Sequence, residues 1–176
     1  MEGQSGWVKD LIRDIPDFPR PGVSFKDITP LLADPKAFGR TVDAMTEPFR
    51  GRTIDKVIGI EARGFIIAAP VALDLHAGFV PVRKKGKLPW RVHAETYDLE
   101  YGTDTLEVHV DAITPGDRIL IVDDVLATGG TAGAVANMVA HMGGVAVGYS
   151  FILELGFLGG RSRTGDLDTF SLVTYE

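Results

Sequence analysis

The sequence predicts a single α/β domain built on a doubly wound, mostly parallel sheet. Two observations carry this prediction: short apolar runs without polar alternation, such as residues 119–122, and helical patterns that begin directly after such runs. Unbroken apolar runs are typical of parallel strands covered on both faces, and strands that alternate with helices build a parallel sheet. The 176 residues, 45% of them hydrophobic, suffice for one compact domain over residues 1–176.

Apolar periodicity places the expected elements along the chain. Helices are expected over residues 4–13, 35–50, 64–75 and 128–141, the last two directly after apolar strands. Strands are expected over residues 56–61, 78–83, 118–123, 145–154 and 169–174, and a hairpin over residues 96–100 and 105–110.

Two segments depart from this regular alternation. Four prolines, at positions 16, 19, 21 and 30, exclude one long helix near the N-terminus, so about residues 1–34 are expected to form a small hood over the sheet edge. The stretch 86–102 indicates a long loop or loose hairpin, and loops of that length are commonly lids. A flexible lid hairpin is therefore expected over about residues 84–108.

Composition excludes several classes of protein. The chain has no cysteine, which excludes disulfides, thiolate catalysis and cysteine-based metal sites. It shows neither a basic start followed by an apolar stretch nor an apolar run of membrane-spanning length, so a cytoplasmic protein without a membrane partner is expected. The net charge of −6 argues against broad nucleic-acid binding.

The segment from Ile119 to Thr131 carries the strongest chemical signal. Asp123 and Asp124 follow an apolar strand and point to opposite sides of the chain, so at least one can accept hydrogen bonds from vicinal hydroxyls, as on a ribose. The following Thr-Gly-Gly-Thr run opens a helix, where free backbone N–H groups and the helix dipole favour a phosphate. A ribose 5′-phosphate would satisfy both halves; the alternative is a strand, a turn and a simple helix cap.

Two basic segments are the next candidates. Arg63, in Glu61-Ala-Arg-Gly64, should open on the same sheet edge as the acidic pair and be free to make forked contacts with phosphate oxygens. The alternative is an ordinary arginine in the first turn of a helix. The densest positive cluster, which could neutralise a departing diphosphate or could simply be solvated, is Arg83, Lys84, Lys85 and Lys87.

Base recognition has a weaker signal. Phe25 lies in an irregular, proline-flanked setting where its ring could stack on a purine while backbone groups read the base edge. A plain core phenylalanine is the alternative. The four histidines lack the spacing of metal ligands, so no protein-built metal cage is predicted.

Taken together, five segments resemble the type I phosphoribosyltransferase family, and their combination resembles its adenine-specific branch. They are residues 119–131, which match the phosphoribosyl-diphosphate (PRPP) signature, and residues 18–28, 59–65, 85–89 and 97–102. Enzymes of the family that act on 6-oxopurines typically place an aspartate three residues after the acidic pair, where this chain has Ala127. The resemblance implies the reaction adenine + PRPP → AMP + diphosphate, in purine salvage.

The resemblance also implies a role for each matching residue. The ribose 5-phosphate of PRPP is expected at Asp123, Asp124, Ala127, Thr128, Gly129, Gly130 and Thr131. The diphosphate is expected at Arg63, Gly64, Arg83, Lys84 and Lys87, and adenine at Ser24, Phe25 and Lys26. Glu100 matches the carboxylate that exchanges a proton with the purine when the lid closes.

The family further implies a homodimer and Mg²⁺, bound mainly through the substrate phosphates because a diphosphate leaving group needs a hard cation. Two other functions stay open from the sequence. One is a phosphoribosyltransferase for another nucleobase, against which Ala127 and the Glu100 motif count. The other is a noncatalytic regulator that senses PRPP, which would call for a coherent basic surface or an added binding domain.

Overall fold

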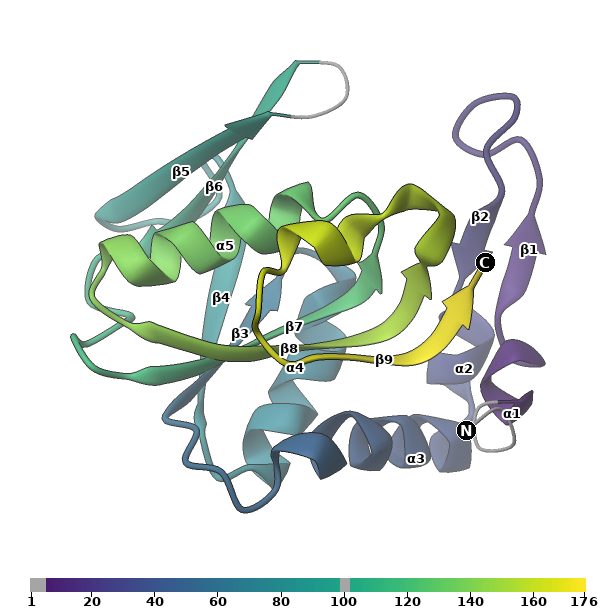
Figure 1. The fold of residues 1–176 in the computed structure, drawn as a ribbon, viewed down its shortest axis with the longest axis horizontal. Coiled ribbons are helices and arrows are strands. Elements are labelled where there is room, and N and C mark those ends of the chain that lie inside the picture. The colour runs from purple at the N-terminus through teal and green to yellow at the C-terminus, as the bar shows by residue number, and fades with distance from the viewer. Residues whose placement is uncertain (1–5, 99–101) are drawn as a thin grey trace.

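A computed structural model describes residues 6–98 and 102–176, and these form one mixed sheet covered by helices, with a small N-terminal sheet beside it (Figure 1). The main sheet has the strand order β5-β6-β4-β3-β7-β8-β9. Five neighbouring strands run parallel: β4 (Gly78–Lys84), β3 (Lys56–Ile60), β7 (Arg118–Leu126), β8 (Val145–Leu155) and β9 (Thr169–Tyr175). The predicted α/β class with a mostly parallel sheet is confirmed.

Helices cover both faces of this sheet. α3 (Pro35–Thr46) and α4 (Arg63–Asp74) lie on one face, and α5 (Gly130–His141) lies on the other (Figure 1). The central strand β7 serves both cores: Leu120 packs in the core on the α3 and α4 side, and Ile121 packs in the core on the α5 side. Because successive strand residues point to opposite faces, the unbroken apolar run supplies both cores at once.

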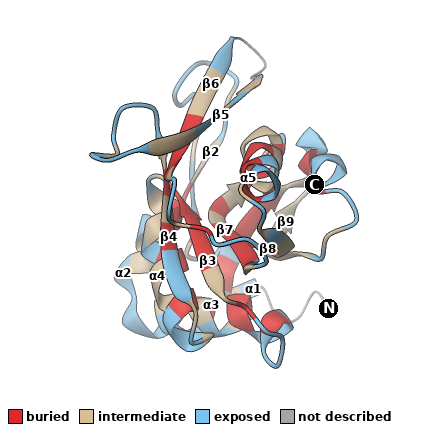
Figure 2. Cartoon of the chain, turned by 90° about the vertical axis from the view of Figure 1, so that its left-hand side faces the viewer, coloured by how far each residue is buried: buried red, intermediate tan, exposed pale blue. Residues whose placement is uncertain are grey.

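Strand β7 extends further than the sequence predicted. It was expected to end at Asp123, but its pairing with β8 continues to Leu126, which lies opposite Glu154. Both acids therefore lie inside the strand near its carboxyl end, whereas the prediction placed Asp124 after it. The strand continues because Val125 and Leu126 pair with β8, and Leu126 is buried while Val125 is partly buried against the opposite core. Figure 2 shows β7 among the largely buried strands of the sheet.

The N-terminal segment also differs from the prediction. Within the described residues the expected helix 4–13 is reduced to α1 (Gly6–Lys9), and the chain enters β1 (Arg13–Ile15). β1 pairs antiparallel with β2 (Phe25–Asp27), with Arg13 opposite Asp27 and an ion pair of 3.3 Å between their side chains. Residues 25–27, expected to be irregular, are thus a strand, because this long-range pairing outweighs local propensity. α2 (Thr29–Ala33) follows.

The predicted hairpin is present and begins earlier than expected. β5 (Val92–Asp98) and β6 (Thr103–His109) pair antiparallel, and β6 also pairs with the end of β4. The hairpin projects from the sheet beside α5 (Figure 1). Short 3₁₀ turns complete the fold: η2 (Glu47–Phe49), η3 (Gly156–Leu158) and η4 (Gly160–Arg163). Across residues 6–98 and 102–176, no helix has the length and apolar character needed to span a membrane.

Candidate active site

The carboxyl ends of β3 and β7 bring the two strongest sequence signals to one edge of the sheet. These strands are parallel neighbours, with Gly59 opposite Val122. Glu61 and Asp123 follow this pair at similar heights, so the Glu61–Gly64 loop and the acidic pair lie beside each other. Ligands of doubly wound sheets bind at such an edge.

The acidic pair is held in a buried setting. The Asp124 side chain is 7% exposed, and its Oδ2 lies 2.7 Å from Nε of Arg63. Asp123 Oδ1 accepts a hydrogen bond of 2.9 Å from the Asp124 backbone N–H. Burial raises the pKa of Asp123 well above its usual range, and the neighbouring Asp124 charge raises it further. Burial also raises the pKa of Asp124, although the Arg63 charge opposes that shift.

A cavity of about 130 Å³ opens between Asp123 and the start of α5. A single water needs only about 10–15 Å³ by a comparable measure, so the cavity has the size of a ligand group. Gly129 adopts a left-handed conformation with φ of 77°, and α5 begins at Gly130. The lining residues include six of the seven predicted for ribose 5-phosphate, namely Asp123, Ala127, Thr128, Gly129, Gly130 and Thr131.

A glycine contact that the sequence did not indicate supports this loop. A Cβ built on Gly129 would lie 2.3 Å from the carbonyl oxygen of Gly160, and one built on Gly160 would lie 2.1 Å from the carbonyl oxygen of Ala127. The backbone of η4 therefore lies directly against the backbone of the loop. Gly160 is 31 residues away from Gly129 and belongs to no recognised motif, so no sequence signal identified it.

Arg63 links the acidic pair to the aromatic candidate. Its guanidinium carbon lies 5.0 Å from the centre of the Phe25 ring, while its Nε pairs with Asp124. Arg63 thus pairs with the buried Asp124 carboxylate through Nε, and its predicted contact with a diphosphate stays a prediction. The acidic pair also leaves no room for a side chain at position 64, because a Cβ on Gly64 would lie 2.7 Å from Asp123 Oδ1.

Phe25 is half-buried and packs edge-on against Phe18, with ring centres 5.2 Å apart. The neighbouring Lys26 points elsewhere: its ammonium contacts Asp14 and lies 4.2 Å from the Tyr175 ring centre. Ser24 is exposed. An aromatic face therefore lies within reach of the acidic pair, and the Lys26 side chain is directed away from it.

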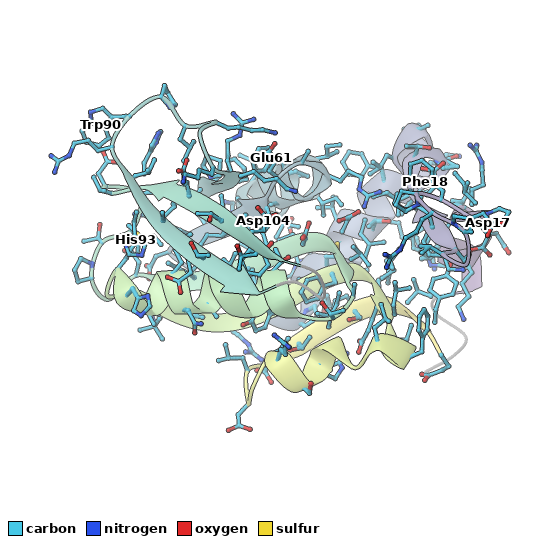
Figure 3. The ribbon with its side chains drawn as sticks, turned by 90° about the horizontal axis from the view of Figure 1, so that it is seen from above. Asp17, Phe18, Glu61, Trp90, His93 and Asp104 are labelled. Carbon is cyan, nitrogen blue, oxygen red and sulfur yellow. The ribbon has the colours of Figure 1, made fainter. Side chains whose placement is uncertain are left out.

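The predicted cationic residues gather around Glu61. Arg83 Nε lies 3.2 Å from Glu61 Oε2, the Lys84 backbone N–H donates to the same oxygen at 3.0 Å, and the Lys87 ammonium contacts Oε1. Burial acts to raise the pKa of Glu61, but these hydrogen bonds and charges outweigh it, so that pKa lies below its usual range. Figure 3 shows Glu61 between the β5–β6 hairpin and the segment that carries Phe18.

Sequence reasoning assigned Glu61 no role, although it stands directly before Arg63 in a recognised segment. Glu61 lies at the centre of the cationic cluster because it contacts residues that are 22 and 26 positions further along the chain. The Glu61–Ala62 peptide bond is cis. The Lys84 ammonium itself lies 3.3 Å from Asp104 of β6, so it joins the hairpin to β4.

The hairpin also reaches the phosphate-sized cavity. The Tyr97 hydroxyl lies 3.2 Å from Oγ1 of Thr131, and this contact joins β5 to the first turn of α5. The predicted catalytic residue, Glu100, lies outside the residues that the structure describes. Its proposed role therefore depends on the sequence.

A ligand-sized cavity, an acidic strand end, a cationic cluster and an aromatic ring thus lie near one edge of the sheet. The model of the phosphoribosyl transferase domain matches residues 33–153. This chain belongs to the phosphoribosyltransferase family.

Its relatives specify a branch of that family. Adenine phosphoribosyltransferase from Myxococcus xanthus is 58% identical over 171 residues, which cover 96% of this chain and 93% of the relative. The adenine phosphoribosyltransferase from Acidothermus cellulolyticus is 64% identical over 152 residues, or 86% of each chain. The crystal structure of adenine phosphoribosyltransferase from Rhodothermus marinus has a TM-score of 0.95 and 50% identity, over 99% of this chain and 100% of that one.

Proposed function

We propose that this protein is an adenine phosphoribosyltransferase that converts adenine and PRPP to AMP and diphosphate in purine salvage. The observation that carries the proposal is a set of contacts around the acidic pair. Arg63 contacts both Asp124 and the Phe25 ring, and Asp123 lines the ligand-sized cavity. The high identity to adenine phosphoribosyltransferases over almost the whole chain supports the same reaction. A yeast adenine phosphoribosyltransferase of 38% identity has been solved with a bisphosphorylated imino-altritol and adenine.

The three parts of the site suit the three parts of the reaction. The cavity at the start of α5 would hold the 5-phosphate through backbone N–H groups and the hydroxyls of Thr128 and Thr131. Asp123 and Asp124 would accept hydrogen bonds from the ribose hydroxyls. Phe25 would stack on adenine, and N9 of adenine would then attack an oxocarbenium-like C1′ as the C1′–diphosphate bond breaks.

The cationic cluster would stabilise the departing diphosphate. Glu61 holds the charged groups of Arg83 and Lys87 near each other, so their positive charge would be positioned before substrate arrives. The Lys84 ammonium is held by Asp104 instead, and Glu61 contacts only the Lys84 backbone. Such pre-positioned charge, together with the alignment of the two substrates, supplies most of the catalysis in this proposal. Glu100 would exchange a proton with the purine, by the resemblance of its motif.

A hard divalent cation fits this donor set. The two carboxylates at the strand end supply the hard oxygen donors that Mg²⁺ prefers. We infer that Mg²⁺ binds there mainly through the oxygens of PRPP and supplies charge neutralisation for the leaving group. Excess EDTA should therefore abolish turnover, and added Mg²⁺ should restore it; full activity in EDTA would contradict this inference.

A panel of nucleobases with PRPP and Mg²⁺, monitored for nucleotide product, tests the reaction directly. Adenine should be converted to AMP, while hypoxanthine, guanine and orotate should react poorly. Use of one of the latter bases and not of adenine would overturn the specificity. Failure with every base, despite PRPP binding, would instead favour a regulator that senses PRPP.

The family resemblance also supports two broader proposals about how the enzyme works in the cell. We infer that it acts in the cytoplasm, where the absence of cysteine suits a reducing environment. We also infer a homodimer. Sedimentation of the purified protein tests this second proposal, because a monomer at working concentrations would contradict it.

A further inference from the structure

Three side chains that could act as metal ligands meet away from the proposed substrate site. His93 and Glu95 belong to β5, and His141 is the last residue of α5. His141 Nδ1 lies 3.0 Å from Glu95 Oε2, and His93 Nε2 lies 3.9 Å from the same oxygen. One nitrogen or oxygen of each residue falls within 4.8 Å of the others.

The strand geometry explains why these side chains converge. His93 and Glu95 are two residues apart on β5, so they point to the same face. Their partners across the hairpin are Val108 and Leu106, both buried in the core that α5 covers. That face therefore looks toward α5, and His141 approaches from the end of the helix. Figure 3 shows His93 beside that end.

One donor atom of the cluster lacks a partner. His93 Nε2 is buried, and among the described residues it has no hydrogen-bond partner. A buried polar atom without a partner is costly, and such atoms are rare in native proteins. The Glu95 side chain is 17% exposed, whereas His141 is 60% exposed and leaves a route from solvent. The His93 side chain is 33% exposed although its Nε2 is buried, so the cluster combines an unpaired buried nitrogen with access from solvent.

We propose that His93, Glu95 and His141 bind a divalent transition metal of the Zn²⁺ type. Imidazole nitrogens are borderline donors, and two of them with one carboxylate oxygen suit Zn²⁺, Ni²⁺ or Cu²⁺ better than Mg²⁺, which prefers oxygen donors alone. In a tetrahedral zinc site with bonds near 2.0 Å, neighbouring donor atoms are about 3.3 Å apart. The distances from Glu95 Oε2 to His141 Nδ1 and to His93 Nε2, 3.0 and 3.9 Å, lie on either side of that value. Water would complete the coordination.

Such a metal would fasten the hairpin to α5. The first turn of α5 lines the proposed phosphate cavity, and Tyr97 of the same hairpin strand already contacts Thr131 there. A metal at His141 would add a second attachment at the opposite end of the helix. The site is independent of the proposed reaction, since none of its three residues belongs to the substrate site.

Titration calorimetry of the full-length protein with ZnCl₂, after EDTA treatment and dialysis, tests the proposal. Excess Mg²⁺ is kept present to compete with Zn²⁺ for sites built from oxygen donors alone. One Zn²⁺ should bind per chain, and the melting temperature should rise with Zn²⁺. His141→Gln and Glu95→Gln should each weaken binding by at least about tenfold, the scale on which even indirect supports of a metal site act.

His109→Gln is the matched control. His109 lies on the neighbouring strand and also has a buried Nε2 without a described partner, but it is not part of the cluster. This variant, and Asp123→Asn, should bind Zn²⁺ as the parent does. The proposal is overturned if the parent shows no saturable binding at millimolar Zn²⁺, or if binding survives unchanged in His141→Gln. Equal loss in His109→Gln or in Asp123→Asn would also overturn it, because the metal would then lie elsewhere.

Discussion

Asp123 and Asp124 place two carboxylates next to each other at a point where even one buried charge is costly. Arg63 compensates Asp124 through a 2.7 Å contact, but the pKa of both acids remains raised. Their ionised forms are the ones that accept hydrogen bonds from ribose hydroxyls and attract a cation. The pair therefore lowers the stability of the free protein in exchange for binding capacity, as functional sites often do.

Asp123→Asn should separate these two effects. Since the folded-state pKa of Asp123 lies above its unfolded value, its stabilising contribution is present at low pH and is lost as pH rises through the folded pKa. At neutral pH the variant should thus melt higher, by on the order of 2–4 °C for each kcal/mol gained. The difference should shrink at mildly acidic pH. A variant less stable than the parent at neutral pH would contradict the assignment.

The same substitution, and Asp124→Asn, should weaken PRPP use more than adenine binding. Each removes a charged acceptor for a ribose hydroxyl, which costs on the order of 1.5–3 kcal/mol, or about ten- to a hundredfold in kcat/KM for PRPP. In Asp123→Asn the amide oxygen of the new side chain can still accept the hydrogen bond from the Asp124 backbone N–H, so the local backbone should be kept. Unchanged PRPP kinetics in both variants would exclude the ribose role.

Glu100 offers a test of proton transfer at the residue scale. If its carboxylate moves a proton to or from the purine, Glu100→Gln keeps the shape but loses the acid–base function, and turnover should fall by about 10²–10⁴. If it merely accepts a hydrogen bond, the loss should appear in adenine affinity. Single-turnover rates with bound adenine distinguish these cases, because product release can mask chemistry. AMP formation at the parent single-turnover rate would remove Glu100 from the chemistry.

Among the elements, the loop before α5 depends on the 3₁₀ turn η4. The two backbones touch at Gly129 and Gly160, where neither position has room for a Cβ. The proposed phosphate site is therefore shaped from two sides: by the helix that it begins and by a turn 31 residues further along the chain. The absence of side chains at the glycines of the loop allows this backbone packing and would also allow a phosphate to approach closely.

Gly160→Ala should damage this loop, because its Cβ would meet rigid backbone at Ala127 and Gly129. Overpacking of this kind costs about 1–3 kcal/mol, and the displaced loop should raise KM for PRPP. Gly133→Ala in α5 is the matched control, since its Cβ would make an ordinary 3.5 Å contact and alanine favours a helix by roughly 1 kcal/mol. Melting temperature and PRPP kinetics measure both. Parent-like values for Gly160→Ala would refute the close contact.

At the scale of the whole molecule, the sheet is stabilised from both sides. Leu120 and Ile121 are adjacent and each is fully buried, but they belong to different cores. The acidic pair lies three residues further along the same strand, so its position depends on both cores.

Leu120→Ala and Ile121→Ala should each lower the free energy of unfolding by about 2–5 kcal/mol, measured by chemical denaturation. Leu73→Ala on α4 is the control, because that side chain is 77% exposed and its removal should change stability by no more than about 0.5 kcal/mol. If either strand substitution were as mild as the control, the corresponding face of the sheet would not be covered.

The sequence by itself determined the fold class and the central motif. Unbroken apolar strands followed by helices identified the parallel sheet, and the acidic pair with its Thr-Gly-Gly-Thr loop is contiguous, so strand, turn and helix start could be inferred from neighbouring residues. The hairpin and the three later helices were also predicted, with boundary errors of a few residues. Local propensity and periodicity act over such short distances, which is why these features were accessible.

The tertiary structure decided the contacts between distant segments. Pairing with β8 carried β7 beyond Asp123, and pairing between β1 and β2 ended the first helix early. Glu61 at the centre of the cations, Gly160 against the loop, and His93 near His141 all join residues more than 20 positions apart. Strand order and register determine which distant residues come into contact. Neither can be inferred from a short stretch of residues, because each depends on which surfaces the whole chain can bury together.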